Sequence, residues 1–448
     1  MTSVLLLACG GASIAPPGDA DAGAPPPPLV DDGCPSIFAQ DILPEYEVEI
    51  APDEWAKLDD EFIHRQQHID AGLDPHPYHP IQFRYQGGAP IPDVMIRLKG
   101  KSSWRHAIAL DARPKMQFVI SFNQIDNQAR FHGVRKLDLD MPRDDRSFLR
   151  QRLALSYLRD LGIEAQCANN ARLVINGTYY GLYTGLEHYD KELLQRVFPH
   201  AADGNLWDAA RTIQTNDTHY DWARLDAFWS VESPAQLAVL ADLPAALHEW
   251  AAEVMIGHGD GYYGGSHNYY LYDHPSRGFV WMPADLDAAI DFYPADLQPI
   301  FTRRADQPRL QWLLVMNDPA WRAQFVQALV AARAGYHVDV LQQRVDAWAA
   351  QIGASAADDA MKPFTAAEHF AAVAAMRDVL PRRAAYLDAW LDCLAHGGVD
   401  ADGDGSPFCH DCDDHDATAH PDAPEACNKL DDDCDGYVDE QPVGMTCP

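Results

Sequence analysis

The sequence predicts an α+β fold in which a strand-rich first half precedes a helical second half, followed by a small acidic module. Three observations predict this order. Segments with period-2 alternation and turn signals dominate as far as Leu182. From Pro308 to Leu394 the chain is rich in Ala and mostly helical in pattern. Beyond residue 396 aspartate and cysteine accumulate, which indicates a separate module.

The strands of the first half are predicted from alternation and from turns. Tyr46–Ile50 alternates apolar and polar side chains, and Pro52 begins a helix whose first turn is acidic. Further strands are expected, in chain order, at His79–Tyr85 and Asp93–Leu98 around the turn Gly87–Gly88, at Lys115–Phe122 and at Arg135–Leu139.

A helix and a hairpin complete the first half. Ser147 can cap a helix that runs to about Leu161, and Gly162 stands where a C-terminal cap belongs. Asn176–Gly177 is the strongest short hairpin signal of the chain, and it joins Arg172–Ile175 to Tyr179–Leu182.

The second half is predicted to be mainly helical. The pattern turns helical between Trp222 and Ile256, and again from Pro308 to Leu394. Between these stretches, Asn268–Tyr272 and Phe279–Met282 are expected to form a hairpin.

Composition supports a large folded core. Of the 448 residues 47% are hydrophobic, and they include 11 Trp, 18 Tyr and 16 Phe. The net charge of −33 argues against nucleic acid as a partner, because phosphate backbones need clustered Lys and Arg. Asp400 to Glu440 holds fifteen acidic residues and one basic residue, Lys429.

The N-terminus is similar to a bacterial lipoprotein signal. The apolar run from Val4 ends at Cys9, which in such signals is lipidated and becomes the first residue of the mature chain. We therefore expect a signal segment at 1–9, a Pro/Ala/Gly-rich tether at 10–40, and an exported protein that is attached to a membrane only through Cys9. The eight other cysteines are an even number, consistent with disulfides in an oxidising compartment, with the pairing left open.

Four segments, in order, resemble motifs of the CotH family of atypical protein kinases. They are Arg97 to Trp104 (R-x-K-G-x-S-S), Val174 to Tyr183 with Glu187 and Asp190–Lys191 (N-G-x-Y-x-G-x-Y…E…D-K), Asp260 to Tyr272, and Pro283 to Asp287. The resemblance implies a two-lobed kinase-like domain at 41–395, with a β-rich first lobe and a helical second lobe. It also implies phosphate transfer from ATP, with Mg²⁺ or Mn²⁺, to Ser or Thr of an exported or surface protein.

Phosphoryl transfer needs a metal held by carboxylate and amide oxygens, and a base for the acceptor hydroxyl. His258–Gly259–Asp260 has the H-x-D form of a kinase catalytic loop, so Asp260 is the candidate that orients or deprotonates the acceptor. Asn268, eight positions later, and Asp285, 25 positions later, are the metal-binding candidates. Asp287 could share the metal or bond to backbone.

The candidates for nucleotide binding are Lys115, Lys99, Arg97 and Glu187. Lys115 lies on a predicted strand after a Gly/Ser-rich turn, where a nucleotide lysine would sit, and Lys99 and Arg97 compete for this role. A strand lysine is also often simply solvated, and Glu187 could equally form a surface salt bridge.

One departure from the kinase pattern favours a rival interpretation. A helical Glu normally holds the nucleotide lysine, but Gln151 stands at that place in the predicted helix. A neutral amide would hold the lysine more weakly. The alternative is a non-catalytic surface or adhesion protein with a stiffened stalk.

The acidic module, residues 396–448, contains two D-x-D-x-D-G segments, the pattern of a loop that wraps Ca²⁺. Together with D-C-D-D and P-x-A-x-E-x-C between them, they resemble the MopE-type repeat. The predicted calcium ligands are Asp400, Asp402, Asp404, Asp411, Asp431, Asp433 and Asp435. A zinc site is less favoured, because carboxylates dominate.

Overall fold

The strands of the first half close into a barrel. The computed structural model describes residues 33–100, 115–141, 143–216, 221–301 and 310–440, so Cys9, most of the tether and Lys101 to Trp104 lie outside the described residues. The strands are β1 (Glu45–Ile50), β2 (His79–Tyr85), β3 (Ile91–Leu98), β4 (Phe118–Ser121), β5 (Lys136–Asp140), β6 (Ala168–Ile175) and β7 (Thr178–Glu187). They follow the order β1-β2-β3-β4-β5-β7-β6.

Closure comes from a parallel pairing between β1 and β6, in which Tyr46 lies opposite Leu173. The other pairs in the barrel are antiparallel. Alternate side chains fill the interior, which is rich in aromatic residues such as Phe83, Phe118 and Tyr183. The α+β class is confirmed, whereas closure of the sheet was not predicted.

Several predicted bounds need correction. The strand expected from Lys115 begins at Phe118, so Lys115 precedes β4. Helix α4 (Arg150–Asp160) begins later than Ser147, because the Asp145 carboxylate accepts the backbone N–H groups of Ser147 and Arg150 at 2.9 Å and forms the turn before the helix. Gly162 follows the last turn in the left-handed conformation, as predicted.

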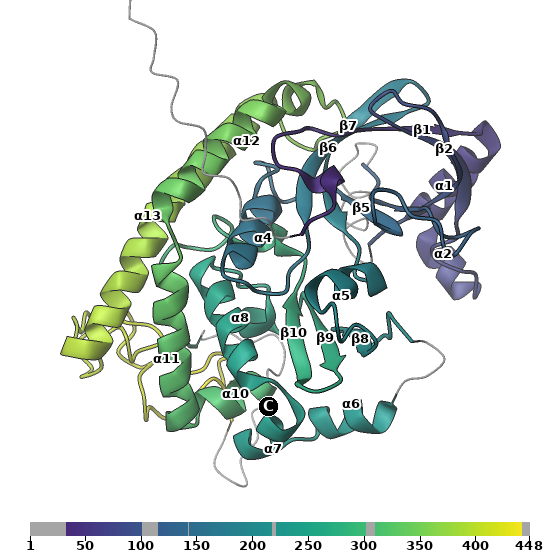
Figure 1. The fold of residues 1–448 in the computed structure, drawn as a ribbon. Helices are drawn as coiled ribbons and strands as arrows, with labels where there is room; N and C mark the ends of the chain where they lie inside the picture. Colours follow the sequence, from purple (N-terminus) through teal and green to yellow (C-terminus); the bar gives the residue numbers. More distant parts are fainter. Residues whose placement is uncertain (1–32, 101–114, 142, 217–220, 302–309, 441–448) are drawn as a thin grey trace, which may run out of the picture.

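The second half is helical around a small sheet (Figure 1). Its helices are α5 (Lys191–Val197), α6 (Trp222–Trp229), α7 (Pro234–Leu240), α8 (Leu243–Met255), α9 (Tyr262–Gly265), α10 (Leu310–Met316), α11 (Pro319–Ala334), α12 (Val338–Asp358) and α13 (Ala366–His396). The sheet contains β8 (Asn205–Asp208), β9 (Tyr269–His274) and β10 (Gly278–Pro283). The β9–β10 hairpin was predicted, and β8 was missed. Helices α1 (Pro52–Ile63) and α2 (Arg65–Asp70) connect β1 to β2.

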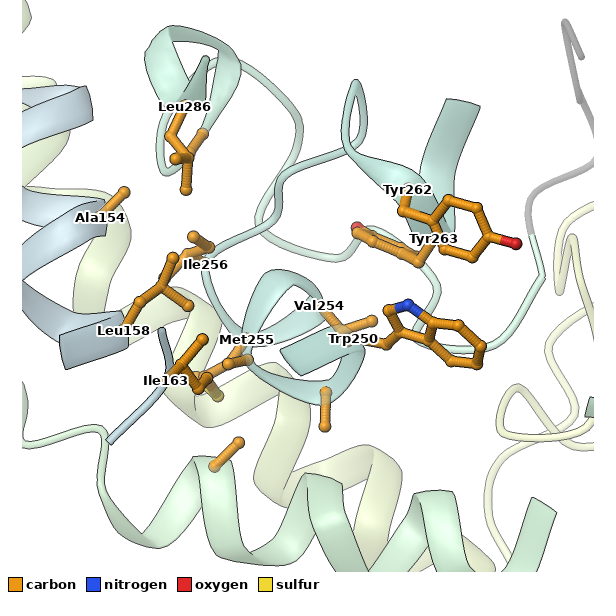
Figure 2. Packing of buried hydrophobic residues seen from close by; sticks show 14 of the residues in the cluster. Ala154, Leu158, Ile163, Trp250, Val254, Met255, Ile256, Tyr262, Tyr263 and Leu286 are labelled. Atoms are coloured by element: carbon orange, nitrogen blue, oxygen red, sulfur yellow. The ribbon is translucent and has the colours of Figure 1, made fainter. Parts of the chain in front are cut away.

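Helix α8 lies at the centre of the second core. Trp250 stacks on Tyr262 with ring centroids 5.2 Å apart, and Trp281 and Trp312 surround it. Figure 2 shows Trp250 beside Tyr262 and Tyr263, and also Ala154 and Leu158 of α4, which lie toward the end of α8. The burial of these large aromatic rings around α8 fixes the position of its C-terminal end and so of the start of the loop that follows. Among the described helices, none combines the length and apolarity that a membrane crossing requires.

Disulfides tie both ends of the described chain to the fold. Cys34–Cys167 joins the N-terminal segment to the start of β6 across 133 positions, and Cys393–Cys409 joins α13 to the acidic module. Cys412–Cys434 closes the module on itself.

A buried ion pair joins the barrel to the helical part. Lys115 Nζ lies 2.7 Å from Oδ2 of Asp359, at the end of α12, and neither side chain is exposed. Asp359 also accepts the N–H groups of Leu182 and Met361, each at 2.9 Å. The ion pair fits against Gly181 because glycine has no Cβ. A Cβ at this position would lie 2.7 Å from Oδ2 of Asp359 and 2.7 Å from Nζ of Lys115. The glycine of the N-G-x-Y-x-G motif is therefore explained by packing.

We expect Lys115→Met to lower the free energy of unfolding by about 3–5 kcal/mol, because it leaves the Asp359 carboxylate buried without its cation. Urea unfolding of the full chain measures the change. Lys57→Met, which removes a surface lysine paired with Glu54, is the matched control and leaves stability nearly unchanged. Equal stability of the two variants would contradict a structural role for Lys115.

Candidate active site

The loop after α8 is held by a buried histidine–glutamate pair. His258 Nδ1 is hydrogen-bonded to Oε1 of Glu253 at 2.9 Å, and Oε2 of Glu253 accepts the N–H of Tyr262 at 3.0 Å. Burial opposes protonation of His258, but the Glu253 carboxylate outweighs it and raises the pKa of His258 above its usual value. A Cβ on Gly261 would lie 2.5 Å from His258 Nδ1, so the loop needs glycine there.

This loop presents Asp260 to solvent and to Asn268. Asn268 Nδ2 donates to Oδ2 of Asp260 at 2.8 Å and to its backbone carbonyl at 3.1 Å. The carbonyl of Asn268 accepts the N–H of Ala284 at 2.8 Å, and Ala284 is the neighbour of Asp285. These hydrogen bonds bring the predicted residues Asp260, Asn268 and Asp285 to one end of the β9–β10 hairpin.

Asp285 and Asp287 occupy the turn that follows β10. Asp285 is exposed and adopts the left-handed conformation with φ of 51°, as the residue before the short 3₁₀ helix Leu286–Ala288. Burial and the nearby Asp285 raise the pKa of Asp287 well above its ordinary range. The backbone carbonyl of Asp287 accepts Nη1 of Arg150 at 3.2 Å, so the start of α4 holds this turn.

Of the predicted cations, Lys99 is the one that faces this group. It extends β3 and forms ion pairs with Asp140 and, at 3.5 Å, with Oδ2 of Asp138. Burial disfavours its charge, but Asp140, Asp138 and Asp285 together raise the pKa of Lys99 above its usual value. The charge of Asp285, from the helical part, thus adds to the effect of the two barrel carboxylates on Lys99.

Asp138 and Asp140 were not predicted as site residues. Burial and the proximity of Asp285 raise the pKa of Asp140 to about 6, against the opposing effect of Lys99. His188 Nδ1 is hydrogen-bonded to Oδ1 of Asp138 at 2.7 Å, and His188 and Lys99 lower the pKa of Asp138 although burial opposes this. The alternation Asp138–Leu139–Asp140 was the available signal, since two carboxylates on one face of a strand are costly without a cation.

The remaining predicted nucleotide residues lie in other surroundings. Lys115 belongs to the ion pair with Asp359 described above. Glu187 is buried and pairs with Arg196, with Oε2 and Nη2 2.6 Å apart, so this is an internal ion pair rather than a surface one. Arg97 Nε donates to the Tyr78 hydroxyl at 3.1 Å. Gln151 is buried in α4.

The acidic module contains two groups of carboxylates that could each hold a cation. Asp400, Asp402 and Asp404 bring ligand oxygens within 4.8 Å of one another, and so do Asp431, Asp433 and Asp435. Burial, together with the charges of Asp404 and Asp402, raises the pKa of Asp411 to about 6. Its Oδ2 is buried and has no hydrogen-bond partner among the described residues, as expected of a ligand atom.

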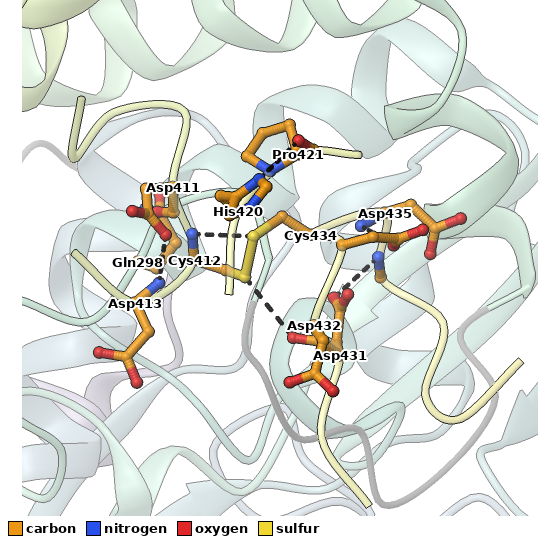
Figure 3. Close-up of a disulfide and its surroundings, with 12 residues drawn as sticks. Gln298, Asp411, Cys412, Asp413, His420, Pro421, Asp431, Asp432, Cys434 and Asp435 are labelled. Atoms are coloured by element: carbon orange, nitrogen blue, oxygen red, sulfur yellow. Dashed lines mark hydrogen bonds between the residues drawn. A yellow bond between two sulfur atoms is a disulfide. The ribbon is translucent and has the colours of Figure 1, made fainter. Parts of the chain in front are cut away.

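Sequence reasoning missed two glutamates of the second group. Glu425 and Glu440 come within 4.8 Å of Asp433, and they lie outside the D-x-D-x-D-G spacing that guided the prediction. Figure 3 shows how the Cys412–Cys434 disulfide lies between Asp411 on one side and Asp431 and Asp435 on the other. The disulfide thus links the two candidate cation sites covalently.

Asp260, Asn268, Asp285 and Lys99 all lie in the part of the chain that a known family covers. A family model described as CotH kinase protein matches residues 96–387, more than half of the chain, so the chain belongs to the CotH kinase family. A second model, described as a putative metal-binding motif of the Cu-binding MopE type, matches residues 411–440. No curated protein matches the chain significantly.

Two solved structures are similar at low scores. One is a crystal structure of the Helicobacter pylori proinflammatory kinase CtkA, with 10% identity and a TM-score of 0.34 over 62% of this chain and 95% of that chain. The other is the Shewanella oneidensis MR-1 toxin–antitoxin system HipA, HipB and its operator DNA complex. It has 13% identity and a TM-score of 0.30 over 74% of this chain and 84% of that chain.

A second glutamate on α8 generates a pH prediction. Glu249 is 3% exposed, and burial together with Glu253 raises its pKa well above its ordinary value. A carboxyl with a raised folded-state pKa stabilises the fold fully below the unfolded-state pKa, and this stability is lost as the pH rises through the folded-state pKa. Glu249→Gln therefore gains stability over the wild type as the pH rises from 4.5, by about 1.4 kcal/mol for each unit between the two pKa values.

Urea midpoints of the two proteins between pH 4.5 and 8 check this prediction, with the exposed Glu232→Gln as the matched control. Parallel curves for Glu249→Gln and the wild type would show that the Glu249 carboxyl is not held neutral.

Proposed function

We propose that this chain is an exported protein kinase that transfers phosphate from ATP to Ser or Thr hydroxyls of an exported or surface protein. The observation that carries the proposal is the hydrogen-bonded pair of Asp260 and Asn268, which is tied through Ala284 to the neighbouring Asp285. Phosphoryl transfer needs a cation for the phosphates, oxygen ligands for a metal and an acceptor base, and these residues together with Lys99 supply all three. Membership of the CotH kinase family supports the same conclusion.

Each protein group has a separate task in the proposed reaction. Lys99 neutralises phosphate oxygens of ATP from the barrel side. Asp260, whose side chain is 46% exposed, orients the acceptor hydroxyl and takes its proton. The acceptor oxygen forms a bond to the γ-phosphorus as the bond to the bridging oxygen breaks, and ADP leaves.

The donor set fits Mg²⁺ or Mn²⁺. Because Nδ2 of Asn268 donates to Asp260, the amide oxygen Oδ1 is turned away from Asp260, and an oxygen is the atom that a hard cation needs. Asp285 supplies an exposed carboxylate and Asp287 a second one nearby. A bound metal would offset phosphate charge, and Asn268, Asp285 and Asp287 would hold it.

Gln151 favours a second candidate function, a non-catalytic surface protein. A buried amide replaces the helical Glu of the kinase pattern, and Nε2 of Gln151 has no hydrogen-bond partner within the described part of the chain. In that case the kinase-like domain would serve structure or adhesion, and the acidic module would stiffen a stalk.

The export proposal is supported by the disulfides. Three cystine bridges are described, and such bonds persist in oxidising compartments. We propose that the chain reaches the cell surface and is held there by a lipid on Cys9, or is secreted.

We further propose that the acidic module binds Ca²⁺ at two places. The first site would use Asp400, Asp402, Asp404 and Asp411, and the second Asp431, Asp433 and Asp435 with Glu425 and Glu440. Clusters of carboxylate oxygens around a glycine turn suit a hard, flexible cation of this kind.

The kinase proposal predicts that Asp285→Asn and Asp260→Asn each lower the rate of phosphate incorporation by about 100-fold or more, because a metal ligand or the acceptor base is lost. Autophosphorylation of the full chain with labelled ATP and Mg²⁺ or Mn²⁺ measures the rate. Asp226→Asn, an exposed aspartate of α6, is the matched control and keeps the wild-type rate.

Nucleotide binding is measured in parallel. A folded wild-type chain that neither binds ATP nor labels itself would favour the structural or adhesive function instead. ATP binding without labelling would support a pseudokinase.

The calcium proposal predicts that Ca²⁺ stabilises the chain by about 2.7 kcal/mol for each occupied site when free Ca²⁺ exceeds the dissociation constant by about 100-fold. Thermal unfolding with Ca²⁺, with EDTA and with Mg²⁺ alone measures this. Asp431→Asn with Asp433→Asn removes the share of the second site and keeps that of the first, because it neutralises two ligands of the second site only. An unchanged melting temperature with and without Ca²⁺ would contradict calcium binding.

A further inference from the structure

The lysine of the candidate site is held by a strand instead of a helix. In the kinase pattern a helical Glu orients the nucleotide lysine, and here Gln151 occupies that place in α4. Lys99 is nevertheless ion-paired with Asp140 and Asp138, both on β5. The barrel thus supplies the carboxylate that the helix lacks. The role inferred for this carboxylate rests on the proposed kinase function.

The barrel register aligns these side chains. The N–H of Lys99 donates to the carbonyl of Gln117 at 2.9 Å, which continues the pairing of β3 with the chain just before β4. Arg97 lies opposite Val119, and Val119 lies opposite Asp138. Side chains two positions apart on a strand point to the same face, so Lys99 shares the face of Arg97, and Asp140 shares the face of Asp138. Lys99 and Asp140 therefore meet on one barrel face because of strand pairing, without a contribution from α4.

Burial and a further hydrogen bond fix the carboxylates. The side chains of Asp138 and Asp140 are 7% and 11% exposed, whereas the Lys99 side chain is 27% exposed. Asp138 is also hydrogen-bonded to His188, in the segment that leads from β7 to α5 and so from the barrel to the helical part. Rigid acceptors behind a partly exposed ammonium group are what a phosphate-binding lysine needs to keep its charge and direction.

We propose that Asp140, with Asp138 behind it, is the positioning residue of the nucleotide lysine Lys99 and takes the place of the helical glutamate. Asp140 acts through Lys99 and touches neither phosphate nor metal. The departure at Gln151 then leaves catalysis possible, because the lysine does not depend on α4 for its orientation.

A double-mutant cycle tests whether Asp140 acts through Lys99. In the full chain, Asp140→Asn is expected to lower kcat/KM for ATP by about 10- to 100-fold, the effect of losing one charged hydrogen-bond partner. In a Lys99→Met background the same change alters kcat/KM by no more than about 2-fold, since the lysine is already absent. Asp140→Glu, which keeps the charge, recovers part of the loss.

Two controls separate positioning from folding and from metal binding. Glu45, at the start of β1, forms a partly exposed ion pair with Arg172, in which Oε2 and Nε lie 2.9 Å apart. Glu45→Gln breaks this pair and is expected to leave kcat/KM unchanged. The Mn²⁺ concentration for half-maximal activity stays the same in Asp140→Asn. Urea midpoints of the single and double variants measure the Lys99–Asp140 contact without ATP, and the double variant is expected to shift by less than the sum of the single shifts.

Each contrary result has a distinct meaning. If Asp140→Asn is as active as Glu45→Gln, the positioning role is overturned while the kinase function stands. If Asp140→Asn lowers activity further in the Lys99→Met background and raises the Mn²⁺ requirement, Asp140 acts on the metal and the proposal is wrong. If the wild type does not bind ATP, the kinase function fails and the positioning role fails with it, although the unfolding cycle still reports the ion pair.

Discussion

The fixed placement of the barrel against the helical part is the constraint on which the candidate site depends. Lys99 belongs to one part and Asp285 to the other, so an opening between them would separate the cation from the metal ligands. The buried pair of Lys115 and Asp359 joins the two parts where water is excluded, and a buried pair tolerates little displacement. Nearby, the Tyr179 hydroxyl donates to the carbonyl of Ser355 at 2.9 Å. Helix α12 is thus bonded to β7 at several points, as its position in Figure 1 suggests.

Much of the fold and part of the site could be predicted from the sequence. Local patterns decide local structure, so β2 has the predicted bounds, and the Asn176–Gly177 turn and the β9–β10 hairpin are present. The ordered motifs indicated Asp260 and Asn268, which the structure brings into contact. The pairing of β1 with β6 was not predictable, because alternation along a strand does not specify its distant partner.

The same limit explains why the sequence favoured Lys115 over Lys99 as the nucleotide lysine. Lys99 follows one strand-like segment and Lys115 precedes the next. The sequence does not indicate which of the two lysines points toward the β9–β10 hairpin. Tertiary pairing directs Lys99 toward Asp140 and Asp285, and Lys115 toward Asp359. For the acidic module the D-x-D-x-D-G spacing identified the aspartates, whereas Glu425 and Glu440 reach the second group only because the loop folds back.

The two outer disulfides have a mechanical consequence. Tension applied to the N-terminal segment would enter the barrel at Cys34–Cys167, at the start of β6, and tension on the acidic module would enter α13 at Cys393–Cys409. Neither attachment point belongs to the loops that hold Asp260 or Asp285. In a chain anchored at one end and pulled at the other, these two covalent bonds would therefore take the load first, at points outside those loops.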